Sequence, residues 1–186
     1  MLPIVIVAVL GAVITAIILT FNKLIRNNNR TKNALSDVDV QLKRRYDLVP
    51  NLVEVVKGYQ QHEASVLEEV TLARTAAIGV QRGTIAERAV AETALSGALK
   101  SFFMVAENYP DLKASENFKQ LQMQLVTLED DIQSARRYYN ACVREMNTAT
   151  QVFPSSIVAL AFGFKEGEFF GADEKEKANV NVSFAR

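Results

Sequence analysis

Residues 118–153 read FKQLQMQLVTLEDDIQSARRYYNACVREMNTATQVF. Their apolar side chains recur at alternating steps of three and four, the a/d heptad pattern of a coiled-coil helix that packs against neighbouring helices. The pattern predicts one helix over 115–152, about 57 Å long. Pro154 ends it, because proline has no backbone N–H with which to continue a helix. The stripe consists of Phe118, Leu121, Leu125, Leu128, Ile132, Ala135, Tyr139, Cys142, Met146, Ala149 and Phe153.

Three earlier stretches show the same helical spacing. Gly79 and Gly83 end the second of them, and Thr84 with Glu87 forms a capping box that starts the third. Pro110 stops the third helix. The expected buried positions are Leu35, Val38, Leu42 and Val49 in the first helix, Leu52, Val56, Tyr59, Val66, Val70, Ala73 and Ala77 in the second, and Ala91, Leu95, Ala98, Phe102 and Val105 in the third.

Pro50 leaves two arrangements open between the first and second helices. It lies either in the first turn of a new helix, with Asp47 as the cap, or inside one continuous and kinked helix. The polar run of Asn27, Asn28 and Asn29 is another place where we expect a helix to fray or hinge.

Helices with one apolar face must pack together, because most helix stability in water comes from burying that face. Short turns at 79–84 and 108–114 make consecutive helices antiparallel neighbours. The predicted fold is all-α: an N-terminal transmembrane helix and an elongated up-and-down antiparallel four-helix bundle with an apolar C-terminal tail. Where the last helix overhangs the third, an uncovered apolar seam would favour self-association.

The N-terminal segment predicts a membrane span. Residues 1–21 carry no charged side chain, and at ~1.5 Å per residue they cover about 30 Å, the thickness of a bilayer's hydrocarbon core. The rival interpretation, a cleaved secretory signal, needs a basic region before the run and a small-x-small site after it. Basic residues follow instead, so the positive-inside bias predicts the N-terminus outside and the bundle in the cytoplasm. These residues are Lys23, Arg26, Arg30 and Lys32.

This organisation divides the chain into a transmembrane helix (1–22), a juxtamembrane basic segment (23–34), a cytoplasmic bundle (35–153) and a C-terminal tail (154–186). We expect the tail to pack on its own bundle or on a neighbouring subunit; a membrane-surface segment and disorder are the alternatives. Its apolar residues are Ile157, Val158, Leu160, Ala161, Phe162 and Phe164, with a strand-like alternation of Val180, Val182 and Phe184 near the end.

The composition argues against several partners and compartments. Lysine plus arginine equals aspartate plus glutamate, at 21 each, so the net charge gives no sign of a nucleic-acid partner. The single cysteine cannot form an internal disulfide, which fits a reducing compartment. We expect Cys142 on the heptad stripe to be core packing.

The sequence offers few groups for chemistry. His62 beside Glu63 lacks the convergent partners of a catalytic or zinc site, so we expect a histidine at the rim of the bundle. The acidic pairs and runs, Glu68 with Glu69 and 129–131, are expected on solvated faces, because di-metal bundles use Glu-x-x-His motifs that are missing here. Nucleotide-binding, nucleophile-elbow and zinc-protease motifs are also missing. We therefore predict no catalytic, cofactor or metal site and no small-molecule substrate.

Two clusters of basic residues are interpreted without a catalytic or nucleic-acid-binding role. In the run 136–139, two arginines followed by two tyrosines, one tyrosine is expected in the seam and the remainder at the surface. Lys43, Arg44 and Arg45 would contact anionic lipid headgroups if the helix lay near the membrane.

Several strings together resemble one known family. The run QLKRRYDLVPNLV at 41–53, then VKGY at 56–59 and His62-Glu63, is similar to the signature of the LemA family of bacterial membrane proteins. The resemblance continues through YPDLK at 109–113 and RRYYN at 136–140, and spans nearly the whole chain in order. It also includes Phe118, Val143, Asn147, Phe153-Pro154 and Gly163-Phe164.

The resemblance implies a bacterial inner-membrane protein with its N-terminus outside, a cytoplasmic helical bundle and no established enzymatic activity. Among the signature positions, the polar residues Asn51, His62, Arg136 and Asn140 are expected to form a buried hydrogen-bond network between helices. The signature positions are Arg44, Arg45, Asp47, Pro50, Asn51, Tyr59, His62, Arg136, Tyr139 and Asn140.

Three functions remain open from the sequence. The first is a self-associating scaffold at the lipid bilayer, formed as a homo-oligomer through the helical seams and the tail. The second is an accessory module that binds another membrane protein, such as a protease or sensor, without large homo-oligomers. The third is an enzyme or metal protein centred on His62 and nearby carboxylates.

Overall fold

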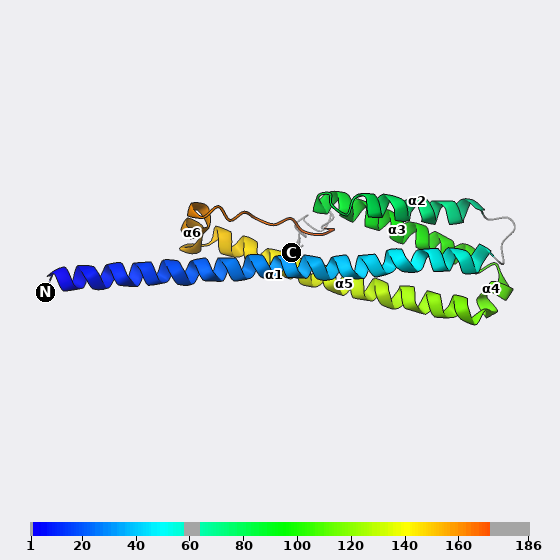
Figure 1. Cartoon of the computed structure of the whole chain (residues 1–186), viewed down its shortest axis with the longest axis horizontal. Coiled ribbons are helices and arrows are strands. Elements are labelled where there is room, and N and C mark those ends of the chain that lie inside the picture. Colours follow the sequence, from blue (N-terminus) through cyan, green and yellow to red (C-terminus); the bar gives the residue numbers. More distant parts are fainter. Residues whose placement is uncertain (1, 58–63, 172–186) are drawn as a thin grey trace, which may run out of the picture. The chain divides into compact units, whose positions relative to one another are not determined.

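A computed structural model describes residues 2–57 and 64–171. Within these ranges the chain forms six helices and no strand, so the predicted all-α helical fold is confirmed (Figure 1). Predictions for Tyr59, His62, Val180, Val182 and Phe184 lie outside the described residues. The helices are α1 (Leu2–Lys57), α2 (Ala64–Gly79), α3 (Ile85–Ala106), α4 (Pro110–Ala114), α5 (Glu116–Gln151) and α6 (Ser155–Ala161).

Helix α1 runs without interruption from the apolar N-terminal segment through Pro50. The asparagine run at 27–29 lies inside it, so the expected fraying there is wrong. Of the two arrangements for Pro50, the structure has the continuous helix; Asp47 is therefore no cap, and residues 52–57 belong to α1 rather than to a second helix. The helix persists because each residue still gains an intrahelical bond on extending it, except where proline supplies no donor.

The chain forms two compact units, which we describe separately. The first comprises Met1–Arg45 and Met123–Glu168, and so contains most of α1, most of α5 and all of α6. Here α1 and α5 are antiparallel, because Arg30 pairs with Glu145 while Arg45, farther along α1, pairs with Glu129, farther back on α5.

Helix α6 packs against α1 and the end of α5. Val158 and Ala159 form a buried cluster with Leu24 of α1 and Ala149 of α5. The helix ends in a Schellman motif: Gly163 has a φ of 72°, its N–H bonds to the Leu160 carbonyl, and the N–H of the following residue bonds to the Ala159 carbonyl. A positive φ at this position is available to glycine without steric cost.

The second unit comprises Tyr46–Gln122 and Phe169–Arg186. Helices α2 and α3 pack as a hairpin, and α2 ends at Gly79 as predicted. The capping box is confirmed, since the Thr84 hydroxyl accepts from the Glu87 N–H while the Glu87 carboxylate accepts from the Thr84 N–H. Pro110 does not stop α3, which ends at Ala106; it opens the short helix α4, where its missing donor costs little.

The predicted stripe of α5 is largely buried. Its members from Leu125 to Ala149 are buried except Ala135, which is half-buried like Leu121. The expected uncovered seam is therefore wrong, because helices of the same chain cover it. Phe153 is also wrong as a core residue: it lies beyond the end of α5 and is 80% exposed.

Candidate functional site

The first unit buries one arginine and pairs it. Arg45 is 1% exposed and its Nη1 donates to Glu129 Oε2 at 2.7 Å. The prediction that Arg45 contacts lipid headgroups is therefore wrong, whereas Lys43 and Arg44 are exposed. A guanidinium this deeply buried requires a carboxylate partner, since an unpaired buried charge carries a large desolvation cost.

The second unit contains a buried polar cluster on α1, α2 and α3. The Tyr46 hydroxyl donates to the Glu92 carboxylate, and both side chains are buried. The guanidinium of buried Arg88 lies 5.6 Å from the centroid of the Phe170 ring, a cation–π geometry. Arg74 Nε donates to the backbone carbonyl of Tyr46 at 2.7 Å. These contacts hold polar side chains of three helices in place inside a helical core.

Sequence analysis missed Arg88 and Glu92, although the sequence carries a signal for both. They extend the three-and-four spacing of Leu95, Leu99 and Phe102 toward the N-terminus of α3. Polar residues on an apolar stripe predict buried, partnered charges rather than solvated ones. The same charges distinguish α3 from a membrane span, although α3 is long and apolar enough to be one by length and composition.

The hydrogen-bond network expected from the family resemblance is wrong at Asn51, which is exposed on α1. Arg136 and Asn140 are half-buried on α5. The tyrosine prediction is confirmed: Tyr139 is buried and donates to the Glu168 carbonyl at 2.8 Å, whereas Tyr138 is exposed. Tyr139 thus attaches the segment after α6 to α5.

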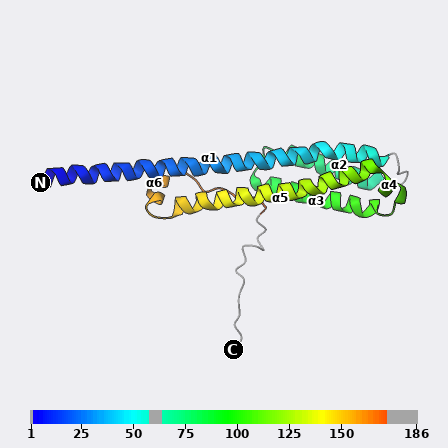
Figure 2. The same ribbon diagram turned by 90° about the horizontal axis from the view of Figure 1, so that it is seen from below.

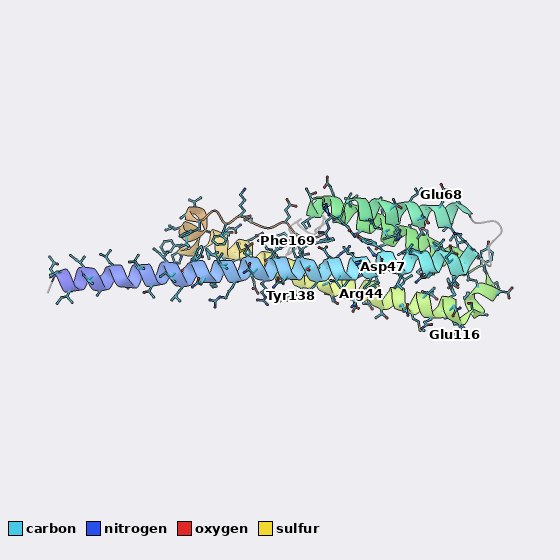
Figure 3. The ribbon with its side chains drawn as sticks, viewed as in Figure 1. Arg44, Asp47, Glu68, Glu116, Tyr138 and Phe169 are labelled. Carbon is cyan, nitrogen blue, oxygen red and sulfur yellow. The ribbon has the colours of Figure 1, made fainter. Side chains whose placement is uncertain are left out.

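Carboxylates do not gather into a metal centre in the ranges 2–57 and 64–171, where no group of three or more His, Cys, Asp or Glu residues has a suitable arrangement. Figure 3 shows Glu68 on α2 and Glu116 at the start of α5. Asp130 and Asp131 are exposed, while Glu129 accepts from Arg45. Cys142 is a free, buried thiol, as expected for a core residue.

The remaining candidate site lies where the apolar start of α1 meets α6. Residues 2–19 are exposed, and the basic residues that follow at 23, 26, 30 and 32 are also exposed. Arg30 donates to the Tyr138 hydroxyl at 3.1 Å and to Glu145 at 3.0 Å. The Tyr138 hydrogen bond, followed by attraction to Glu145, raises the pKa of Arg30 above its ordinary value.

A cavity of about 680 Å³ opens beside this junction. It is lined by α1 residues between Thr20 and Asn27, by the end of α5 and by the turn into α6. Lys23 and Arg144 bring two cations to its wall, Glu145, which is paired with Arg30, brings a carboxylate, and Phe153 contributes an exposed aromatic ring. The lining thus combines apolar side chains with charges of both signs.

Comparison with known proteins identifies the family. The model of the LemA family matches residues 34–184, which is most of the chain and begins after the apolar segment. The chain belongs to the LemA family. The LemA match therefore covers the helices from the middle of α1 onward, while the N-terminal part of α1 is a candidate membrane span by its length and composition.

Relatives with names include the protein LemA of Metamycoplasma hominis, 29% identical over 167 residues, which cover 89% of this chain and 75% of the relative. The magnetosome protein MamQ 2 of Paramagnetospirillum magneticum is 24% identical over 183 residues, covering 86% of this chain and 67% of the relative. The magnetosome protein MamQ of Magnetospirillum gryphiswaldense is 23% identical over 185 residues, covering 87% of this chain and 68% of the relative.

Proposed function

We propose that this LemA-family chain is a single-pass protein of the bacterial inner membrane whose cytoplasmic helical bundle is a non-enzymatic, self-associating scaffold. One observation carries the proposal: α1 is a single helix that starts as an exposed, uncharged run and continues into buried positions such as Leu24, Val38 and Leu52. Exposed apolar surface of this length is stable in lipid, not in water. The helix that spans the bilayer is thus also a core helix of the bundle.

The orientation follows from charge. Exposed Lys23, Arg26, Arg30 and Lys32 follow the apolar run directly, and basic flanks remain on the cytoplasmic side. The bundle, which comes after this flank, is then cytoplasmic with the N-terminus outside. A chain whose single cysteine is a buried thiol suits that reducing compartment.

A scaffold role rather than catalysis is supported by how the polar residues are used. In the core, Arg45 pairs with Glu129 and Tyr46 with Glu92, so these groups hold helices together. Catalysis requires a nucleophile or base that faces a substrate cavity together with groups that orient it. The cavity at the α1–α6 junction is lined by Lys23, Arg144 and apolar side chains, and the carboxylate among its lining residues, Glu145, is paired with Arg30.

Self-association needs a surface other than the covered heptad stripe. Two large apolar residues one turn apart on α5, Met123 and Val126, are 60% and 58% exposed. Membrane anchoring confines the chains to two dimensions and raises their effective concentration, so a small contact of this kind is enough to favour assembly. We propose that this face of α5 contributes to the contact between copies.

The alternative function, an accessory module for another membrane protein, is favoured by the burial of the heptad stripe. The most regular apolar face of α5 is buried within its own chain, so it is not available as a seam for a large homo-oligomer. The exposed pair Met123 and Val126 remains, and it can contact either a second copy or a different protein.

Cysteine cross-linking in native membranes tests the proposal. The Val126→Cys variant is expected to form disulfide-linked dimers on mild oxidation, while Gln124→Cys, exposed about 160° away around the same helix, is not. Cys142 is buried in both variants and does not interfere. Monomers from both variants, together with a monomeric mass for the full-length protein in detergent across a wide concentration range, would refute self-association. A single cross-linked product with another membrane protein would favour the accessory module.

A further inference from the structure

Helix α6 has apolar residues on both of its faces. Val158 and Ala159 pack inward, whereas Ile157 and Leu160, on the opposite side, are 61% and 85% exposed. Between Val152 and Phe164 the sequence has no charged side chain. A helix that is apolar all round is normally buried on all sides, so the outward face of α6 lacks its natural environment in water.

The position of α6 indicates what that environment is. The ring of Phe162 lies 4.7 Å from the ring of Phe21 between centroids, and Phe164 lies 5.9 Å from it. Phe21 is the last apolar residue of the N-terminal run, and Lys23, two residues on, is the first charge. Both views show α6 beside α1, with α1 continuing alone from there toward the N-terminus (Figures 1 and 2). Helix α6 therefore packs beside the end of the apolar run, where the proposed membrane span of α1 ends.

We propose that α6 and the turn before it form a second membrane contact, a short apolar element that lies in the headgroup layer beside the transmembrane helix. Phe153, Leu160 and Phe162 enter the boundary between headgroups and acyl chains, which is the depth that interfacial helices occupy. This inference rests on the proposed membrane anchoring of α1. In addition to the anchor formed by α1, the protein would then contact the lipid surface at a second point, through α6.

The charges around α6 fit this occupant better than a protein partner. Lys23 and Arg144 are exposed on the wall of the adjoining cavity, and the negative charge of Glu145 on the same wall is paired with Arg30. Basic residues next to inserted aromatic and aliphatic side chains are the pattern of a helix on an anionic membrane surface. The cavity between these cations and Phe153 suits the phosphate and glycerol region of an anionic phospholipid.

Tryptophan fluorescence provides a direct test, because the chain has no native tryptophan and each variant reports one site. Three single-tryptophan variants of the full-length protein would be reconstituted in vesicles of phosphatidylcholine and phosphatidylglycerol with bromine-labelled acyl chains. Leu160→Trp reports α6, Leu10→Trp reports the proposed span, and Val40→Trp is an exposed apolar control, about 28 Å along α1 from Phe21 on the side away from the span. All three sites are exposed, so the substitutions leave the core intact.

The expected result is loss of Leu160→Trp fluorescence with bromines placed near the headgroups, a shift of its emission to the blue, and little quenching of Val40→Trp. Leu10→Trp should be quenched most strongly by bromines deep in the acyl chains. Quenching of Leu10→Trp without quenching of Leu160→Trp would overturn the contact by α6 while leaving the anchor intact. Protection of Leu160→Trp from both lipid and aqueous quenchers would assign the surface to a protein, and thus also overturn it. An unquenched Leu10→Trp would refute the anchor and with it this inference.

Discussion

At the scale of single residues, Pro50 deprives the Tyr46 carbonyl of its usual donor. An α-helix bonds each carbonyl to the N–H four residues on, and proline has no N–H. Instead, Arg74 Nε on α2 donates a hydrogen bond to the Tyr46 carbonyl oxygen at 2.7 Å. This contact explains why α1 continues through a proline, and it couples α2 to α1 inside the second unit.

Replacing Arg74 with leucine should therefore lower the free energy of unfolding by about 1–3 kcal/mol, the range for removing a charged donor from a part-buried acceptor. In a Pro50→Ala background the loss should be smaller, because the new N–H then bonds the same carbonyl. A double-mutant cycle measured by chemical denaturation in detergent gives the coupling. Arg82→Leu, an exposed arginine in the α2–α3 turn, serves as the control. Equal losses in both backgrounds would show that the two residues are independent.

The buried Arg45–Glu129 pair allows a second prediction at this scale. Glu129→Leu should destabilise the protein by about 3 kcal/mol, the lower end for breaking a buried pair, because Glu129 is 33% exposed and water relieves part of the cost. Adding Arg45→Met should restore much of the stability by removing the uncompensated charge. Glu145→Leu breaks the exposed pair with Arg30 and should change stability by less than about 1 kcal/mol. Thermal unfolding followed by circular dichroism compares the variants, and no recovery in the double variant would count against this account.

At the scale of elements, the start of α3 depends on its capping box. Thr84→Ala removes the oxygen that accepts from the Glu87 N–H, and should lower stability by about 0.5–2 kcal/mol. Thr93→Ala, on the exposed face of the same helix, is the matched control because its hydroxyl bonds to a carbonyl within the helix. Chemical denaturation of both variants measures the difference. A cap variant as stable as the control would show that packing of α3 alone determines where the helix starts.

A second element, the segment after α6, is attached to α5 by a two-way hydrogen bond. Asn147 Nδ2 donates to the Gly167 carbonyl at 3.1 Å, and the Gly167 N–H donates to Asn147 Oδ1 at 2.8 Å. A Cβ at Gly167 would lie 3.4 Å from Val143, so the backbone approaches α5 closely. Asn147→Ala should make the Gly167 amide exchange with solvent faster by tenfold or more, since about 1.4 kcal/mol of lost bonding is a factor of ten. Hydrogen-exchange mass spectrometry measures this, with Thr148→Ala as an exposed neighbour for comparison.

At the scale of the whole molecule, the proposed orientation in the membrane rests on the distribution of charge beside the apolar run. In the proposed topology position 2 is outside the cell and position 119 is in the cytoplasm. Leu2→Cys should therefore react with a membrane-impermeant maleimide in intact cells, whereas Lys119→Cys should react only after the membrane is opened. Both positions are exposed, so burial does not confuse the result, and the native Cys142 is buried. Labelling of Lys119→Cys in intact cells would show that the bundle lies outside the cell, opposite to the proposed topology.

The local pattern of the sequence determined the helices and their boundaries where chemistry is local. The heptad spacing predicted the burial of Leu125, Ile132 and Met146, and the Thr84–Glu87 pair predicted a helix start. Uncharged residues at 1–21 predicted a helix of membrane length. These features depend on side chains within a turn or two of one another, so a single sequence contains the information.

The tertiary structure alone decided which polar residues are buried and how the proline is accommodated. Arg45, in a run with Lys43 and Arg44, resembles a surface charge until a carboxylate on a distant helix neutralises it. Pro50 permitted both a break and a continuous helix, and the donor that settles the matter lies on α2. The placement of α6 against Phe21 is likewise invisible in either segment by itself. Each depends on a partner far away in the chain, and the energy of a buried charge or carbonyl is set by that partner rather than by its neighbours in sequence.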